Sequence, residues 1–238
     1  MMLKDILGIF IDFDILDRYG GRMLNGLGIT LELVAISVTL GVVLAFGIAL
    51  ARLSENPLLS KPALAYTTFF RGSPLLAQLY LAYYGSGQLR DTFESLGIWW
   101  FFRDAFNCAV LTFTLNTAAY QAEVLRGAIQ SVPKGQWEAA HALGLSRFEI
   151  MRSVIMPQAI LVALRPLGNE LVIMIKASSV ASLVTLLDLM GATRFAFART
   201  FDLQVYLYAA VLYLLMVETI RRVWDALERR LTRHLALA

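Results

Sequence analysis

Hydrophobic residues in this sequence gather into five long stretches that are separated by short polar connections. We place the stretches at about 24–51, 62–84, 105–122, 158–180 and 203–220. The part of the first stretch from Leu33 to Ala51 contains no charged residue. A helix of about 20 apolar residues is long enough to cross the hydrocarbon core of a bilayer. The pattern therefore predicts an all-α membrane protein with five transmembrane helices.

The two ends of the chain differ from the five stretches in charge. Residues 1–23 are amphipathic and lean acidic, which predicts an interfacial or surface segment. They hold no basic region ahead of a short apolar core, so we expect the first transmembrane helix to serve as the insertion signal. Residues 24–224 are predicted to form the transmembrane domain, and residues 225–238 a basic tail.

The second stretch is interrupted by the run Arg71-Gly72-Ser73-Pro74. Glycine and proline together break the helical hydrogen bonds, and a membrane tolerates such a break only where protein or water satisfies the freed groups. Broken helices beside a transport pathway are common in transporters. Arg71, Gly72 and Pro74 are therefore candidates for a gate, although Arg71 could equally serve only as an anchor at the membrane interface.

The fourth stretch contains charged residues at membrane depth. Glu170 and Lys176 should face the interior of the helix bundle or a water-filled cavity, and a kink is expected at Pro166. We expect two connections to be loops. Residues 85–104 hold Trp99 and Trp100, which are typical of a membrane–water interface, and the other loop follows the fourth stretch up to Asp202.

Composition supports a membrane protein and excludes several other classes. Hydrophobic residues make up 58% of the 238 residues and charged residues only 16%, against about 25% charged in a soluble domain. The net charge of +3 is too small to indicate a nucleic-acid partner. The single cysteine, Cys108, rules out an internal disulfide.

Lysine and arginine residues predict the orientation in the membrane. The connection between the third and fourth stretches is basic, and so is the C-terminal tail, whereas the connection between the second and third holds only Arg90 and Arg103. Cytoplasmic loops carry an excess of Lys and Arg. We therefore expect a cytoplasmic C-terminus and a periplasmic N-terminus.

The basic connection after the third stretch carries a long motif. Glu138-Ala139-Ala140 is followed by Gly144 and later by Val154, Met156 and Pro157. Alanine favours helix, and Gly144 is a natural left-handed helix stop. A second helix is predicted to begin at Ser146, with Glu149 completing a capping box, and to run towards Pro157. This spacing resembles the EAA loop of permease subunits of ABC importers, with Val154 and Met156 in place of the usual Ile and Leu.

Two further stretches are similar to permeases for polar amino acids. The run Arg71 to Gln78 matches an Arg-Gly-Thr-Pro-Leu-Leu-x-Gln signature, with Ser73 in place of Thr. The resemblance is nearly unbroken from Asn116 to Pro157 and covers roughly residues 20–225. It departs from the family at Arg165, where a proline is usual. Within the family it looks closest to the M-type subunits of histidine, arginine and opine uptake systems.

The resemblance implies a type I importer permease with the MetI-like fold, located in the bacterial inner membrane. Two permease subunits, often two related chains, would form the pathway. A dimer of ATP-binding subunits would dock on the cytoplasmic side, and a periplasmic solute-binding protein on the other. The chain itself would bind no cofactor, because ATP and Mg²⁺ belong to the ATPase.

The same resemblance suggests roles for particular residues. Coupling to the ATPase is expected from the EAA segment, with Gly144 for the turn and Glu138 for polar contacts; its residues are Glu138, Ala139, Ala140, Gly144 and Pro157. Asn116, Asn169 and Glu170 are candidates for the substrate path, since they are polar and lie at membrane depth. A carboxylate at Glu170 would suit a cationic amino acid. Interhelical packing is an equally good interpretation of these three residues.

Chemistry that would make the chain an enzyme is missing from the sequence. It holds no Walker-type loop and no Ser-His-Asp or Cys-His arrangement, and its two histidines are too few for a metal site. The alternative to a permease subunit is a channel or secondary transporter that works alone. The sequence leaves open which amino acid or opine is carried, and whether the partner permease is identical or a paralogue.

Overall fold

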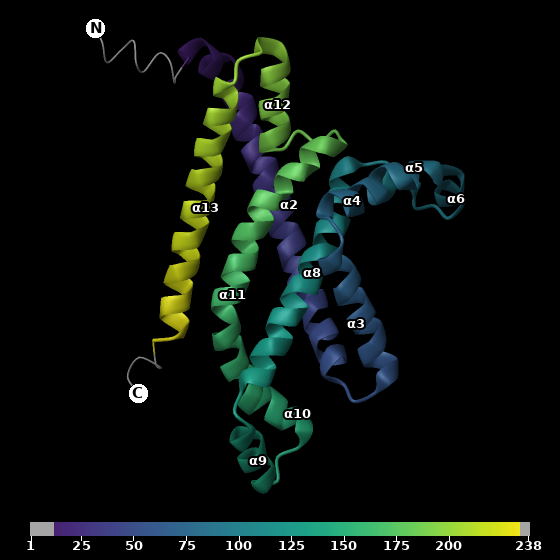
Figure 1. Ribbon diagram of the computed structural model, residues 1–238, viewed down its shortest axis with the longest axis vertical. Coiled ribbons are helices and arrows are strands. Elements are labelled where there is room, and N and C mark those ends of the chain that lie inside the picture. Colours follow the sequence, from purple (N-terminus) through teal and green to yellow (C-terminus); the bar gives the residue numbers. More distant parts are fainter. Residues whose placement is uncertain (1–11, 234–238) are drawn as a thin grey trace. The chain divides into compact units, whose positions relative to one another are not determined.

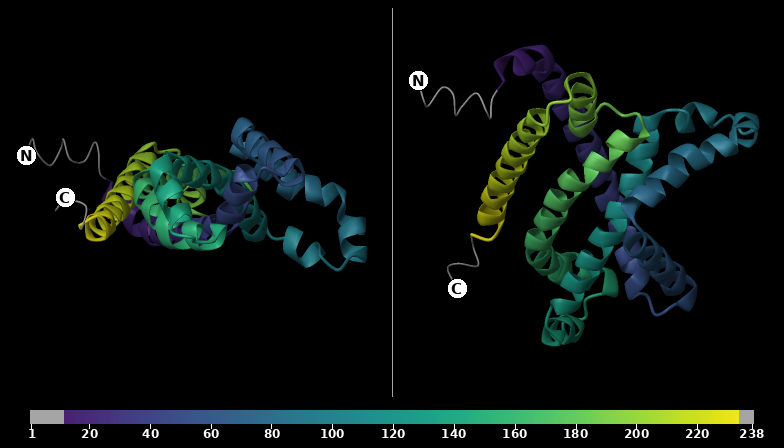
Figure 2. Two further views of the ribbon diagram at one scale, coloured as in Figure 1. Left: turned by 90° about the horizontal axis from the view of Figure 1, so that it is seen from below. Right: turned by 45° about the horizontal axis from the view of Figure 1, so that its top comes forward.

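The computed structural model describes residues 12–233, and across that range it contains helices and no strand (Figures 1 and 2). The predicted all-α class is confirmed. Expectations that concern residues 1–11 and 234–238 lie outside the described residues. The long helices are α2 (Phe13–Leu53), α8 (Ala105–Ser131), α11 (Met156–Ala177) and α13 (Gln204–Leu231).

Shorter helices connect the long ones. Before α8 they are α3 (Pro57–Gly72), α4 (Leu75–Tyr80), the π-helix η1 (Leu81–Gly85), α5 (Ser86–Gln88), α6 (Arg90–Ser95) and α7 (Trp99–Phe102). After α8 they are α9 (Lys134–Ala142), α10 (Arg147–Glu149), the π-helix η2 (Ile150–Ile155), the 3₁₀-helix η3 (Ser178–Val184) and α12 (Leu189–Thr200).

Three helical segments in residues 12–233 are long and apolar enough to cross a membrane: α2, the stretch Arg147–Val184, and α13. The other two predicted membrane segments are shorter or less hydrophobic as helices, for two different reasons. The segment at 62–84 is divided between α3 and α4, and neither part reaches membrane length. The segment at 105–122 lies in the 27-residue helix α8, whose Asn, Thr and Gln side chains lower its hydropathy.

Both predicted loops contain helices, so those expectations were wrong. Residues 85–104 include α5, α6 and α7, which are each so short that hydrophobic periodicity cannot reveal them. The segment before Asp202 contains α12, whose N-terminus is capped by Asp188. An aspartate N-cap of this kind is a helix signal that the sequence carries and that could have located α12.

The described chain forms two compact units, and several helices contribute to both. The first contains residues 12–37, Pro74–Phe113 and Met174–Thr219; the second contains Val38–Ser73, Thr114–Ile173 and residues 220–233. In the first unit, α2 packs on α12 and α13 through two small apolar clusters. Met23, Leu189 and Ala209 are buried in one of them, and Ile15, Ala196 and Val205 in the other.

Polar contacts reinforce this packing where α2 meets the start of α12. The buried Asp188 accepts hydrogen bonds from the backbone N–H groups of Gly191 (2.9 Å) and Met190 (3.4 Å), and the Leu189 N–H donates to Thr30 Oγ1 at 3.1 Å. Burial raises the pKa of Asp188 to about 6, although the two backbone hydrogen bonds favour its charged form. The Asp188 carboxyl group therefore fixes the N-terminus of α12, and the Leu189 N–H fixes the contact of that end with α2.

Gly26 provides the close approach that this contact requires, and a pair of alanine substitutions tests it. A Cβ atom at Gly26 would lie 2.7 Å from the Asp188 carbonyl oxygen, whereas one at Gly28, on the same helix, would meet nothing within 4 Å. We expect Gly26→Ala to destabilise the first unit by roughly 1–3 kcal/mol through overpacking against backbone. Gly28→Ala should be neutral or stabilising, because alanine favours helix. Melting temperatures of the purified protein measure both, and equal values would contradict the expectation.

Candidate functional site

The Glu138-Ala139-Ala140 segment lies in α9, in the second unit, and ends in a well-defined turn. The Leu145 N–H donates to the Ala140 carbonyl at 3.3 Å, and the Gly144 N–H donates to the His141 carbonyl at 2.9 Å. These are the two bonds of a Schellman motif, which places a left-handed residue just after the helix. Gly144 is that residue, with φ = +77°. The predicted left-handed stop at Gly144 is confirmed.

The predicted capping box at Ser146 and Glu149 is also present. The Glu149 N–H donates to Ser146 Oγ at 3.3 Å, and the Ser146 N–H donates to Glu149 Oε2 at 2.8 Å. Hydrogen bonds from the Ser146 hydroxyl and backbone hold the pKa of Glu149 below its usual range. The turn between α9 and α10 is therefore fixed by glycine geometry on one side and by side-chain hydrogen bonds on the other.

The helix that starts after this turn runs towards Pro157 as predicted, and it continues beyond that residue. Helical structure continues from α10 through η2 into α11, and Pro157 is the second residue of α11. The π-helix immediately before it has already displaced the regular hydrogen-bond pattern, so the missing proline N–H interrupts nothing further. One continuous run of helix therefore links the α9–α10 turn to Glu170.

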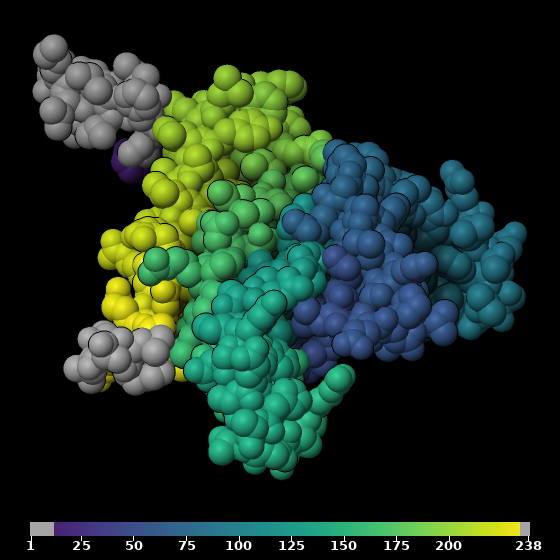
Figure 3. Space-filling view, turned by 60° about the horizontal axis from the view of Figure 1, so that its bottom comes forward, coloured from purple at the N-terminus to yellow at the C-terminus, as the bar shows by residue number. Residues whose placement is uncertain are grey.

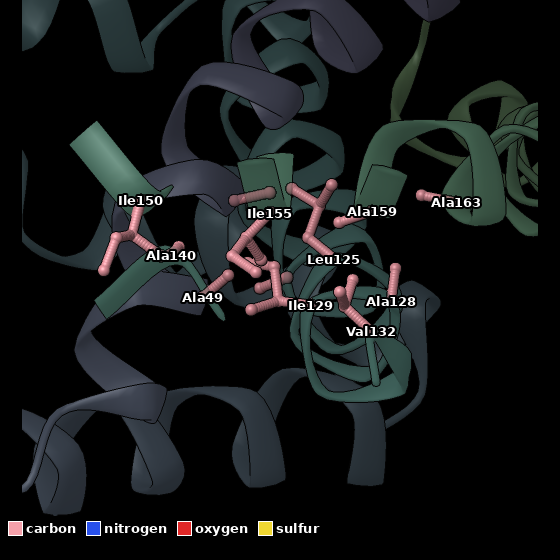
Figure 4. Close-up of a cluster of buried hydrophobic side chains, with 12 residues drawn as sticks. Ala49, Leu125, Ala128, Ile129, Val132, Ala140, Ile150, Ile155, Ala159 and Ala163 are labelled. Atoms are coloured by element: carbon pink, nitrogen blue, oxygen red, sulfur yellow. The ribbon is translucent and has the colours of Figure 1, made fainter. Parts of the chain in front are cut away.

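An apolar cluster holds α9 against the rest of the second unit. Ala140 is buried there with Ile150 and Ile155 from η2 and with Leu125 and Ile129 from α8 (Figure 4). Trp137 and Leu145 pack on the edge of the same cluster. Because the Ala140 side chain is only a methyl group, α9 can lie close to η2. A movement of α9 would consequently be transmitted to the helical run that contains Pro157.

The opposite face of α9 is open. Glu138 and Ala139 are exposed, and the turn adds two large apolar side chains, Leu143 at 79% exposure and Phe148 at 72%. This segment lies at the surface of the second unit (Figure 3, teal). A single turn of small and apolar residues beside a carboxylate is suited to entering a groove on another protein.

A second polar site surrounds Glu123 in the same unit. Its carboxylate lies 3.0 Å from Arg52 Nε, 2.8 Å from Arg126 Nη2 and 3.9 Å from Arg71 Nη1. The Glu123 side chain is 14% exposed, and Arg52 and Arg126 are 17% and 26% exposed. One carboxylate thus joins arginines from α2, α3 and α8, and the group carries excess positive charge.

The end of α3 is tied to α8 beside this cluster. The last carbonyl groups of a helix have no partner within it. Asn116 Nδ2 donates to the Phe70 carbonyl at 3.0 Å, and the Tyr120 hydroxyl donates to the Arg71 carbonyl at 3.3 Å. The Arg71 guanidinium also lies 5.4 Å from the centre of the Tyr120 ring. Asn116 is buried, and its bond to the Phe70 carbonyl favours the interpretation that this residue serves helix packing.

The helix break follows directly. Ser73 is the C-cap of α3, with its N–H bonded to the Phe69 carbonyl, and Pro74 is the extended N-cap of α4. Gly72 is the last residue of α3, and a Cβ atom added there would meet nothing within 4 Å. No close approach of neighbouring atoms therefore requires glycine at this position.

The remaining two candidates lie on α11. Asn169 is exposed and Glu170 is half-buried, and the positive charge of Arg71 acts on the Glu170 carboxylate. The structure thus brings Glu170 into electrostatic reach of the Arg71–Glu123 cluster. Sequence reasoning missed Glu123 as the centre of that cluster. A lone carboxylate close to the end of a polar membrane helix, with arginines on three neighbouring segments, was the available signal.

The family model for the inner membrane component of binding-protein-dependent transport systems matches residues 37–233. The chain is 42% identical over 207 residues to the octopine transport system permease protein OccM of Rhizobium radiobacter, covering 87% of this chain and 84% of the relative. It is 38% identical over 215 residues to the histidine/lysine/arginine/ornithine transport system permease protein HisM of Escherichia coli strain K12, covering 90% of each.

A solved structure shares the fold. A chain from the crystal structure of an amino acid ABC transporter with histidines superposes with a TM-score of 0.81 at 34% identity. The match covers 92% of this chain and 99% of that chain. The fold is therefore that of a chain of an amino acid ABC transporter over almost its full length.

Proposed function

The chain belongs to the family of inner membrane components of binding-protein-dependent transport systems, and we propose that it carries cationic amino acids or opines. It is a permease subunit of an ABC importer and not an enzyme. The observation that carries this proposal is the identity of about two residues in five to permeases named for octopine and for histidine, lysine, arginine and ornithine. A half-buried carboxylate at Glu170 supports a cationic substrate.

Membership of this family implies an ATPase and a solute-binding protein as partners. We propose that a dimer of ATP-binding subunits docks on the exposed face of α9, with Glu138 in polar contact and Gly144 setting the turn. ATP and Mg²⁺ would be bound by that dimer. The continuous helix from α10 to α11 supports a mechanical route from the docked ATPase to Glu170.

The pathway is proposed to lie between this chain and a second, paralogous permease. The excess of Lys and Arg supports placing α9, α10 and the C-terminal end on the cytoplasmic side and the N-terminus on the periplasmic side. Arg71, Gly72 and Pro74 would form a gate on this pathway. Asn116 and Asn169 remain candidates for the substrate path, with helix packing as the alternative.

Transport itself is tested by uptake into proteoliposomes. We would reconstitute this chain with its partner permease, ATPase and binding protein and follow radiolabelled arginine, histidine and octopine, with and without internal ATP. ATP-dependent uptake of at least one of these supports the proposal and identifies the substrate. Flux through this chain alone, without ATP, would overturn it in favour of a channel or secondary transporter.

A Glu170→Gln substitution tests the role of the carboxylate. We expect uptake of a cationic substrate to fall about fivefold, since a partly exposed ion pair contributes up to about 1 kcal/mol. Assembly with the ATPase, measured by co-purification, should survive. Glu94→Gln, the same substitution in an exposed ion pair of α6, is the control and should leave uptake unchanged. Loss of assembly in Glu170→Gln would support the packing alternative instead.

A further inference from the structure

A groove of about 500 Å³ lies between α11 and the C-terminal part of α13, within the second unit. Its walls are formed by Gly168, Asn169 and Val172 on one side and by a face of α13 on the other. The α13 residues recur every three or four positions, so they share one side of the helix: Ile220, Arg221, Trp224, Asp225, Glu228 and Arg229. Asn169 is also a candidate for the substrate path, but the transport mechanism proposed above gives no role to the other residues that line this groove.

Trp224 forms the wall against α11. Its indole N–H donates to the Leu164 carbonyl at 2.9 Å. A Cβ atom at Gly168 would overlap the indole ring, so only glycine allows this packing. The tryptophan is therefore held in one position, and the groove beside it is a formed feature of the unit.

The groove carries three arginines against two carboxylates. Arg165 pairs with Glu228 at 3.0 Å, and Arg221 pairs with Asp225 at 3.4 Å. Arg229 pairs with no carboxylate in the part of the chain that the structure describes. The three arginine side chains are exposed, and each guanidinium carries five N–H donors, more than a single carboxylate can accept. The excess charge is positive, and the ligand should be an anion.

The groove lies where α13 changes character. No charged residue occurs from Gln204 to Val217, and Leu214 and Leu215 are 67% and 58% exposed, as expected of a surface that faces lipid. From Glu218 onward every turn carries charges. Tryptophan and arginine at such a boundary are typical of the membrane–water interface. The groove is therefore at the level of lipid headgroups.

We propose that this groove binds the phosphate group of an anionic phospholipid from the leaflet on the side of the C-terminus. Arginine guanidinium groups bind phosphate oxygens through paired hydrogen bonds, and basic pockets between membrane helices recognise anionic headgroups. Val172 and Ile220, which line the groove itself, provide an apolar surface for the start of the acyl chains. A free phosphate ion shares the headgroup chemistry but would gain nothing from that apolar surface.

Native mass spectrometry of the purified complex tests the proposal. Phosphatidylglycerol, phosphatidylcholine or inorganic phosphate is titrated onto the complex in detergent, and the retained ligand is counted. We expect phosphatidylglycerol to bind more tightly than phosphatidylcholine. The double substitution Arg221→Gln with Arg229→Gln should weaken its binding about fivefold for each arginine. The control, Arg222→Gln with Arg230→Gln, removes the same charge from adjacent positions of α13 outside the groove and should leave the affinity unchanged.

Three results would overturn the proposal. An equal loss of affinity for phosphatidylglycerol in both double variants would indicate a general basic surface, and displacement of phosphatidylglycerol by inorganic phosphate would indicate a site for a free anion. Equal binding of phosphatidylglycerol and phosphatidylcholine would show that the groove does not recognise an anionic headgroup. If the first double variant fails to assemble, Arg229→Gln alone serves, because it leaves no partner carboxylate unpaired in the described structure. That single variant should still bind phosphatidylglycerol about fivefold more weakly.

Discussion

A Gly144→Val variant should lose ATP-driven uptake almost completely. Gly144 has φ = +77°, a backbone conformation that costs an ordinary L-residue roughly 1–2 kcal/mol and a β-branched residue more. Valine would therefore break the Schellman turn that ends α9 and shift the positions of Glu138 and Leu143. Because about 1.4 kcal/mol corresponds to tenfold in an equilibrium, we expect coupled uptake in proteoliposomes to fall at least tenfold.

Two further variants distinguish the effect of backbone conformation at Gly144 from the effect of adding a side chain. Gly144→Asn should retain much of the activity, since asparagine tolerates the left-handed conformation. Gly135→Ala, in the first turn of the same helix, introduces a side chain into open space at an ordinary φ and should behave like the unmodified protein. Normal uptake by Gly144→Val, with the ATPase still bound and ATP still required, would show that this turn has no part in coupling.

The local signals in the sequence predicted the turn between α9 and α10 because its structure is set by neighbouring residues. A left-handed glycine and a serine–glutamate capping box both act over three or four positions. The same local signals do not show how far this helix extends, because the π-helix before Pro157 removes the usual effect of proline on a helix. Local reasoning failed for α12, where the Asp188 cap is the main helix signal in a short segment that holds several charged residues.

The polar site was harder to predict because it depends on contacts between distant segments. Arg52 and Glu123 are 71 positions apart, and no periodicity along the chain relates them. From the sequence, Arg71 can be interpreted as a gate or as an anchor. Its contacts with Glu123 and Tyr120 join α3 to α8, so they can be seen only in the folded structure. Glu170 was identified from its charge at membrane depth alone, which gives a location but no partner.

Those contacts make Glu123 the residue whose loss should most reduce stability. Glu123→Gln leaves the arginines at positions 52, 71 and 126 close together with no carboxylate between them. Removing one partner of a buried ion pair costs about 3–5 kcal/mol, and we expect about 3 kcal/mol here because Glu123 is 14% exposed. The melting temperature of the purified complex should fall, and the amount of assembled complex should fall with it.

A second substitution distinguishes this charge effect from a simple loss of hydrogen bonds. The double substitution Glu123→Gln with Arg126→Gln also removes one of the arginines that have lost their carboxylate partner. It should recover part of the lost stability, which a double-mutant cycle measures. Glu94→Gln, in the exposed pair with Arg90, should leave the melting temperature unchanged. If Glu123→Gln melts like Glu94→Gln, the three arginines are solvated independently, and the ion pairs of Glu123 do not contribute to holding α2, α3 and α8 together.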